Sequence, residues 1–301
     1  MAKEGFVAVT TGLLKESVSA WSDHKAPKMG AALAYYTAFS LAPLIIFMLS
    51  LVSLAIKRDE AARAIVAQIS DLIGADGGKV VQDILDHAST TAALSWGTAL
   101  SFLLLVVSAS GAFGELQDSL NTIWEVPKQK HPWLAMIKDR LLSLSMVFVL
   151  GFFMMTSLLL STFVTGITTY YMSEGSKFAL EIANTVVSFL VVTGLFGFIF
   201  RFLPDARLHW RDVWPGAIFS SVLFIAGKFA LGFYISHSAF ASSYGAAASF
   251  VVILVWVFYS AQILYFGAEF TRAYTRRFGS HQESLDTPPL KGRVKRAGAV
   301  A

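Results

Sequence analysis

Apolar stretches and short polar segments alternate along most of the chain. A membrane-spanning helix needs roughly 20 mostly apolar residues, and four stretches without charged side chains are long enough: 29–56, 88–114, 141–173 and 182–200. A fifth apolar region, 213–268, is too long for one span. It contains the polar, small-residue segment SHSAFASSYG at 236–245, so we divide it into 213–237 and 244–268. The pattern predicts an all-α, polytopic integral membrane protein with six transmembrane helices.

Composition agrees with this interpretation. The chain has 301 residues, of which 55% are hydrophobic and 15% charged, and its mean hydropathy is +0.60. There is no cysteine, which excludes disulfides and thiolate metal sites. We therefore expect no cofactor of that kind.

The basic residues predict which ends face the cytoplasm. Lys and Arg concentrate in cytoplasmic segments of membrane proteins. Eighteen of the 24 basic residues lie in four segments that would share one side: 1–28, 115–140, 201–212 and 269–301. Only five lie in the segments between, 57–87 and 174–181. Both termini are therefore predicted to be cytoplasmic.

Short amphipathic helices are expected at both membrane faces. Residues 1–28 form a cytoplasmic N-terminal segment in which Phe6, Val9 and Leu13 share one side with Trp21, as in a helix lying on the inner leaflet. The stretch has no cleavage site of the kind that follows a signal peptide. The six-helix domain then spans residues 29–278.

The outer loop, residues 57–91, shows helical spacing of apolar residues on both sides of GADGG at 74–78. Two short amphipathic helices over the outer face are predicted. The alternative is a phosphate-binding loop at GADGGK. That alternative fails because Val80 stands where a Ser or Thr is required.

The tail, residues 279–301, is basic and contains two prolines and few large apolar residues. Such a composition predicts a disordered cytoplasmic segment that binds anionic lipid headgroups. RNA is the rival partner, but the basic cluster has no aromatic residues beside it. Nucleic acid is therefore not an expected partner.

One residue breaks the pattern of the fifth predicted helix. Lys228 is the only Asp, Glu, Lys or Arg inside the six spans as drawn. A lysine at the bilayer centre costs about 2.5–3.5 kcal/mol on insertion scales, so its position needs a reason. Counting about 1.5 Å per residue, it lies roughly 14 Å from the outer end of the helix at His237.

Three explanations for Lys228 stay open. Its stem snorkels toward the outer headgroups, or its ammonium pairs with Glu181 or Asn184 at the outer end of the fourth helix. Alternatively, it lines a hydrated cavity that attracts an anion or a lipid phosphate. Ser221, two turns along the same face, would extend such a polar surface.

Other polar positions lie within the spans. Pro43 removes an amide proton and predicts a kink in the first helix, which occurs both in transporters and in inert bundles. Tyr35 and Tyr36 either hydrogen-bond across helices or pack. Gln262 makes the sixth helix polar and is expected to face protein or water. Gly245 and Ser249 form a small-xxx-small pair suited to helix packing.

Charged residues border two of the spans. Glu269, Arg272 and Arg276 follow one another at helical spacing at the inner end of the sixth helix, and we interpret them as an interfacial salt-bridge anchor. Between 114 and 127, Leu116, Leu120 and Ile123 predict an amphipathic helix with Trp124 at the headgroups. Its polar stripe is formed by Glu115, Asp118 and Asn121, which suits a solvated face or a coupling-ion site.

Four stretches resemble one family, the YihY/BrkB family of bacterial inner-membrane proteins, once labelled ribonuclease BN. The resembling segments are GAALAYYTAFSLAPLI (30–45), SGAFGELQDSLNTIWEV (110–126), FLPDARLHWRDVWPGAIFSS (202–221) and YGAAASFVVILVWVFYSAQILYFGAEF (244–270). They occur in order between residues 30 and 270 and so span most of the chain. The resemblance implies a six-helix, multi-pass protein of the bacterial inner membrane.

A ribonuclease is not supported by the residues. Metal-dependent RNA cleavage needs clustered His and Asp ligands that hold cations beside a water. The six histidines are instead scattered along the chain and never occur as His-x-His or His-x-x-x-His. No nucleophile motif is present either, so no catalytic or metal-binding residue is assigned.

The sequence favours transport or translocation of an anionic small molecule or lipid, with Lys228 engaging the anionic group. The alternative is a non-catalytic envelope scaffold or assembly protein, in which the polar residues serve helix packing. No inverted repeat is evident in the sequence, so internal symmetry gives no support for alternating access.

Overall fold

The computed structural model describes residues 6–53, 56–73, 75–91, 111–127, 177–206, 208–237 and 248–279, and single positions at 145, 152 and 156. All regular structure in these residues is helical. The helices are α1 (Phe6–Asp23), α2 (Ala26–Val52), α3 (Arg58–Ile73), α4 (Ala75–Thr91), α7 (Lys177–Phe202), α8 (Trp210–His237) and α10 (Ala248–Phe278). A further helical segment covers 111–123.

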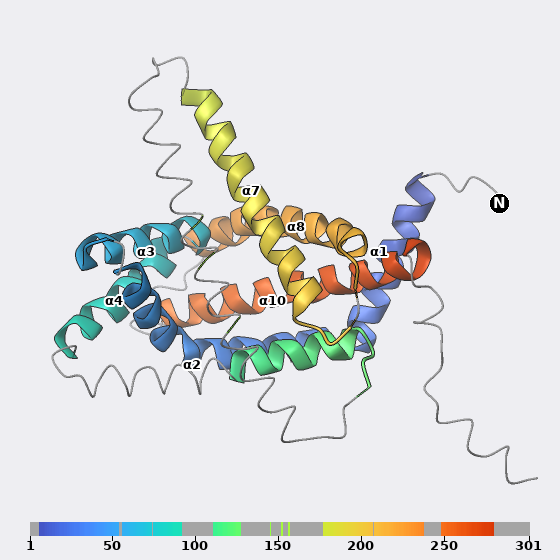
Figure 1. The fold of residues 1–301 in the computed structure, drawn as a ribbon, viewed down its shortest axis with the longest axis horizontal. Helices are drawn as coiled ribbons and strands as arrows, with labels where there is room; N and C mark the ends of the chain where they lie inside the picture. Colours follow the sequence, from blue (N-terminus) through green and yellow to red (C-terminus); the bar gives the residue numbers. More distant parts are fainter. Residues whose placement is uncertain are drawn as a thin grey trace, which may run out of the picture.

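Helix α10 lies at the centre of the described helices. It packs against α2 on one side and α8 on the other, and α1 crosses its C-terminal end (Figure 1). Helix α7 packs on α8 and crosses it obliquely, while α3 and α4 lie at the opposite end of α2 and α10 (Figure 1). The central helix therefore joins both ends of the bundle.

Four described helices are long and apolar enough to cross a membrane: Ala26–Ser50, Thr185–Phe202, Trp210–Leu231 and Phe250–Phe278. They correspond to the first, fourth, fifth and sixth predicted spans. The second and third, 88–114 and 141–173, lie mostly outside the described residues, as does most of the turn at 236–245 and of the tail at 279–301. Six spans, and the side that each end faces, stay predictions.

The contact between α8 and α10 depends on small residues. A Cβ atom at Gly216 would lie 1.7 Å from the Thr271 hydroxyl oxygen, and one at Gly267 would lie 1.7 Å from the Ser220 hydroxyl oxygen. Both hydroxyls donate to carbonyls of their own helix, Ser220 to Gly216 at 2.8 Å and Thr271 to Gly267 at 2.7 Å. Each glycine thus makes room for a hydroxyl that stays hydrogen-bonded without reaching across the interface.

The two amphipathic helices predicted in the outer loop are confirmed as α3 and α4. Ile65 and Val81 are buried on them and pack in one cluster with Ile45 of α2. Helix α4 begins at Ala75, so the predicted interruption at 74–78 is shorter than expected. Gly78 lies within this helix. Its missing side chain makes room for Ser70 of α3, whose oxygen would lie 1.9 Å from a Cβ at position 78.

The N-terminal amphipathic helix is confirmed as α1, but its apolar side meets protein. Leu13 is buried in a cluster with Phe270 and Ala273 of α10, and Val9 packs against the same cluster. Burying this side against α10 removes apolar surface from water. The expected contact of this face with lipid is therefore replaced by a helix contact.

The predicted helix between 114 and 127 is present, and Leu116, Leu120 and Ile123 are buried on it. Trp124 differs from the expectation: it is 4% exposed and belongs to the central core cluster, not to the headgroup region. The physical reason is tertiary cover, since Leu203 and Leu208 in the connection before α8 belong to the same cluster. An amphipathic pattern identifies an apolar face but does not tell whether lipid or protein packs against that face.

Candidate functional site

Lys228 lies on α8 and is half-buried. The large exposed apolar side chains of this helix form one broad stripe, composed of Trp210, Trp214, Ile218, Val222, Phe229 and Phe233. Lys228 lies at one edge of that stripe, five turns along the helix from Trp210. It follows the fully buried Ser221 by seven residues, which places the two on one face, two turns apart. The backbone of Lys228 thus borders the side of α8 that packs on protein.

The two partners suggested for Lys228 lie on α7. Glu181 and Asn184 belong to its first turns, and their side chains lie outside the described residues. The N-terminal half of α7 leads away from the bundle in Figure 1. Pairing of either residue with Lys228 stays a prediction.

Ser221 and the two tyrosines have different surroundings. The Ser221 hydroxyl donates to the Ala217 carbonyl at 2.8 Å, so its proton serves its own helix. Tyr35 and Tyr36 are 59% and 41% exposed on α2. The Tyr36 ring packs beside Gly111, where a Cβ would lie 3.0 Å from it. The two tyrosines thus lie on α2, whereas Ser221 shares a face of α8 with Lys228.

Gln262 contacts the first turn of α2, and Pro43 lies within that helix. The Gln262 amide donates to the Ala26 carbonyl at 3.4 Å, and this amide fills the space that a side chain at Gly30 would need. Gln262 therefore faces protein, at the first turn of α2. Helix α2 continues through Pro43, and the Ser40 hydroxyl donates to the Thr37 carbonyl at 3.0 Å.

A charged cluster occupies the end of the bundle where α1, the start of α2 and the end of α10 meet. At its centre is Glu269, which is 1% exposed. The Glu269 Oε1 atom lies 2.5 Å from His24 Nδ1, a distance at which the ring N–H donates to the carboxylate. Arg272 lies one turn further along α10, with its guanidinium 3.7 Å from Glu269 Oε2.

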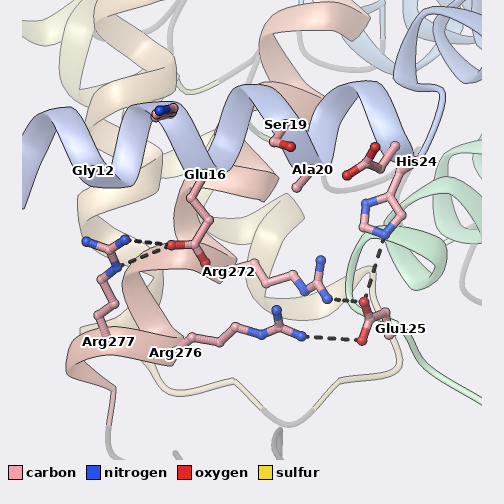
Figure 2. A pocket seen from close by; sticks show the side chains of 11 residues that line it. Gly12, Glu16, Ser19, Ala20, His24, Glu125, Arg272, Arg276 and Arg277 are labelled. Atoms are coloured by element: carbon pink, nitrogen blue, oxygen red, sulfur yellow. Dashed lines mark hydrogen bonds and ion pairs between the residues drawn. The ribbon is translucent and has the colours of Figure 1, made fainter.

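Glu125 completes this cluster from a third segment. Its carboxylate forms an ion pair with Arg272, accepts from Arg276 at 3.3 Å and lies 4.0 Å from His24 Nε2 (Figure 2). The residue ends the helix of 111–123 in a left-handed conformation, with φ of 51°. Lys25, between α1 and α2, has a φ of 56°. These two reversals position Glu125 and His24 at the end of α10.

An open groove of about 650 Å³ lies beside the cluster, between α1 and the C-terminal turns of α10 (Figure 2). On its α1 side, Glu16 accepts from Nε of Arg277 at 3.2 Å and from Nη2 at 2.9 Å. Lys15, Asp23 and Glu125 also line it. The groove contains both signs of charge, and two of its carboxylates, Glu16 and Glu125, are held by arginines.

Two carboxyl groups of the 111–127 segment have shifted pKa values. Desolvation alone would raise the pKa of Glu125, but the hydrogen bond from Arg272 and the charges of Arg272, Arg276 and His24 outweigh it and lower the pKa. Burial raises the pKa of Glu115, and the negative charge of Asp118 adds to that effect. Glu125 is thus held ionised as the acceptor of two arginines.

Polar side chains of the 111–123 helix bind the segment that connects α7 to α8. Asn121 donates to the Asp205 carboxylate at 3.1 Å and accepts from the Asp205 backbone N–H at 2.8 Å. Gln117 donates to the same carboxylate at 3.2 Å. Asn121 thus fastens the connection between α7 and α8 to the helix.

Sequence reasoning identified the Glu269, Arg272 and Arg276 constellation but missed His24 and Glu125. Both lie at helix ends, where Ala26-Pro27 and Val126-Pro127 follow closely and indicate a chain reversal. Among the described residues, no group of three or more His, Asp or Glu side chains could hold a metal ion. The contacts of Glu269 and Glu125 make the cluster an ion-pair network.

Comparison with known proteins gives the family. The family model described as virulence factor BrkB matches residues 17–289. A UPF0761 membrane protein of Alkalilimnicola ehrlichii is 26% identical over 81% of the chain and 54% of its own length. Another of Pseudomonas aeruginosa is 27% identical over 81% of the chain and 58% of its own length.

The chain thus spans little more than half the length of these two relatives. A ribonuclease-like protein of Bacillus subtilis, YfkH, is 26% identical over 88% of the chain and 95% of its own length. No solved structure matches. Because the family model covers nearly the whole chain, the protein belongs to the BrkB family of membrane proteins.

Proposed function

We propose that the protein moves an anionic small molecule, or the anionic headgroup of a lipid, across the bacterial inner membrane. The observation that carries the proposal is the position of Lys228. It is half-buried within the apolar helix α8, at the border between the stripe of exposed aromatic and aliphatic side chains and the side that holds the buried Ser221. A cation retained inside a span marks a substrate or ion pathway in many membrane proteins.

The charge of Lys228 defines the substrate class. An ammonium in a region of low dielectric attracts a phosphate, carboxylate or similar anion much more strongly than the same group in water. Ser221 lies on the same face and retains its oxygen lone pairs as acceptors after donating to Ala217. Ser221 is fully buried, so a substrate hydroxyl would reach its oxygen only after α8 moves relative to its neighbours.

The test is transport by the purified protein in liposomes, with labelled anionic lipid or an anion-sensitive dye as the readout. Lys228→Met should abolish transport while leaving the thermal unfolding temperature within a few degrees of the wild type. Lys228→Arg should retain part of the activity because it keeps the charge. Lys57→Met, which removes an exposed cation at the start of the outer loop, is the matched control and should behave as the wild type.

A structural role for the same helices is the second candidate, and one observation favours it. The hydroxyls of Ser220, Ser221, Thr271 and Thr275 each donate to a carbonyl four residues earlier in their own helix. These buried hydroxyls satisfy carbonyls of their own helices, as expected where the helices only pack against each other. For an envelope scaffold, Lys228→Met would lower stability without any transport to lose, and crosslinking in cells would recover one defined partner.

The ribonuclease-like name of YfkH belongs to that protein. The described residues offer no group suited to a catalytic metal, and the histidines follow no ligand spacing. Incubation of labelled RNA with the detergent-purified protein should leave the RNA intact. Cleavage that disappears on substitution of His24 would restore the enzymatic reading.

A further inference from the structure

We propose that the groove between α1 and the C-terminal turns of α10 binds the phosphate of an anionic phospholipid headgroup. This groove lies at the end of the bundle, away from the middle of α8 where Lys228 is found. The inference does not depend on transport by the protein. It would hold equally for a scaffold.

The groove presents guanidinium groups to one open space. Arg276 and Arg277 are adjacent in the chain, and their side chains are 35% and 37% exposed. Lys15 lines the opposite wall, on α1. An arginine has five N–H donors, so Arg277 can hold Glu16 and a phosphate oxygen at once. Guanidinium and phosphate form paired, charge-assisted hydrogen bonds.

A small residue leaves room for this arrangement. A Cβ atom at Gly12 would lie 2.9 Å from Nη1 of Arg277. The guanidinium therefore lies close to the backbone of α1 at Gly12, with Glu16 one turn away on the same helix. A larger residue at position 12 would push the guanidinium outward and change the shape of the groove.

The charge balance favours an anion. The lining contains four basic side chains, Lys15, Arg272, Arg276 and Arg277, and three carboxylates, Glu16, Asp23 and Glu125. Glu125 is shared by Arg272 and Arg276, and Arg272 also faces Glu269, which is buried behind the lining. The side chains that line the groove thus carry one more positive than negative charge.

The position of the groove favours a lipid over a free phosphate. The groove lies beside the last turns of the apolar stretch Phe250–Phe278. The ring of Tyr274 contacts that of Phe278 there, and Phe278 is 54% exposed. Aromatic side chains at the end of a spanning helix mark the headgroup level, where lipid phosphates lie.

The experiment measures phospholipid retained by the full chain in native mass spectrometry, with phosphatidylglycerol and phosphatidylcholine offered at equal concentration. The wild type should retain phosphatidylglycerol preferentially. Lys15→Gln and Arg277→Gln should each weaken that retention about fivefold, as expected for one basic residue at a membrane surface. Arg63→Gln, an exposed position on α3 at the other end, should have no effect.

Glu16→Gln separates binding from packing. It breaks the same ion pair as Arg277→Gln but leaves the cation in place, so phosphate binding should become stronger. If both variants weaken retention, the ion pair only docks α1 on α10 and the proposal is wrong. Equal retention of the two lipids would also overturn it, as would competition by millimolar glycerol phosphate, which would identify a soluble ligand. Loss of transport in Lys228→Met leaves each of these outcomes unchanged.

Discussion

The imidazole Nδ1 of His24 lies 2.5 Å from the carboxylate Oε1 of Glu269, although 245 positions separate the two residues in the chain. His24 sits between α1 and α2, and Glu269 lies near the end of α10. This contact joins the first and last described helices at one end of the bundle. Because Glu269 also faces Arg272, the carboxylate balances charge from two directions.

Removing the Glu269 carboxylate should be costly. In Glu269→Ala, Arg272 loses one of its two carboxylate partners and His24 loses its hydrogen-bond acceptor. Removing one member of a buried ion pair destabilises by about 3–5 kcal/mol, so we expect a clear fall in the unfolding temperature in detergent. The measurement is thermal unfolding followed by circular dichroism.

A double-mutant cycle then isolates the contact itself. His24→Ala, Glu269→Ala and the double variant should give a coupling energy of about 1–3 kcal/mol. Strictly additive losses would show that the 2.5 Å contact contributes nothing of its own.

The glycine contacts between α8 and α10 predict a strong effect of adding one methyl group. In Gly216→Ala, the new Cβ would lie 1.7 Å from the Thr271 oxygen and 3.2 Å from the Gly267 carbonyl oxygen. Because backbone is among the atoms met, the two helices must separate. Overpacking of this kind costs about 1–3 kcal/mol. The unfolding temperature in detergent is the readout.

Gly114→Ala is the matched control for that substitution. Gly114 also lies in a helix, but no atom lies within 4 Å of a Cβ built there. Alanine favours the helix by about 1 kcal/mol over glycine, so this variant should be neutral or more stable. Equal losses in the two variants would rule out the close approach at Gly216 as the cause.

Hydrophobic periodicity was enough to predict several helices. The spacing of apolar residues located α1, α3, α4 and the segment 111–123, because each has one apolar face against the bundle. The same periodicity did not tell lipid from protein. Trp124 was expected at the headgroups and is buried, since its cover comes from residues near 203–208, far away in the sequence.

Which small-residue pair lies in a helix interface, and which charged residues meet, depends on contacts between segments that are distant in the sequence. Gly216 and Ser220 have the same small-xxx-small spacing as Gly245 and Ser249. Only the partner helix shows that the first pair lies in an interface, while Gly245 lies outside the described residues. His24 and Glu125 carry no motif at all. Their roles follow from the chain reversals that bring them to Glu269 and Arg272.

The pairing of Asn121 with Asp205 predicts a charge-dependent loss. In Asn121→Asp, the donor at 3.1 Å becomes a carboxylate oxygen facing another carboxylate. We expect a loss of about 1 kcal/mol at neutral pH, which becomes smaller in acid as the carboxylates are protonated. Chemical unfolding at two pH values measures both effects.

Exchanging the two groups tests the direction of that hydrogen bond. In Asn121→Asp combined with Asp205→Asn, the donor lies on the connection and the acceptor on the helix. The exchange should restore part of the lost stability. Recovery is incomplete because Asp205 Oδ2 accepts from both Asn121 and Gln117, so the Gln117 amide must turn its oxygen toward the new donor. No recovery would mean that the effect on stability does not come from the hydrogen bond between residues 121 and 205.

The ion pairs of Glu125 predict how stability changes in acid. The pKa of Glu125 in the folded protein is below its ordinary value of 4.5. A group with a lowered pKa stabilises the fold above its unfolded pKa and loses that contribution as the pH falls through the folded value. At neutral pH, Glu125→Gln should therefore be less stable than the wild type, and the gap should close below about pH 4.

The exposure of the Glu125 side chain determines the size and the salt dependence of this stability difference between the wild type and Glu125→Gln. The Glu125 side chain is 57% exposed, so solvent screening limits the effect to about 1 kcal/mol or less. Glutamine has a Cβ as glutamate does, so the cost of the left-handed backbone at φ of 51° is the same in both proteins. The difference in unfolding temperature between them, measured from neutral pH into acid, should also narrow as salt is added. A difference that persists unchanged in acid would show that the effect of Glu125 on stability does not depend on the charge of its carboxylate.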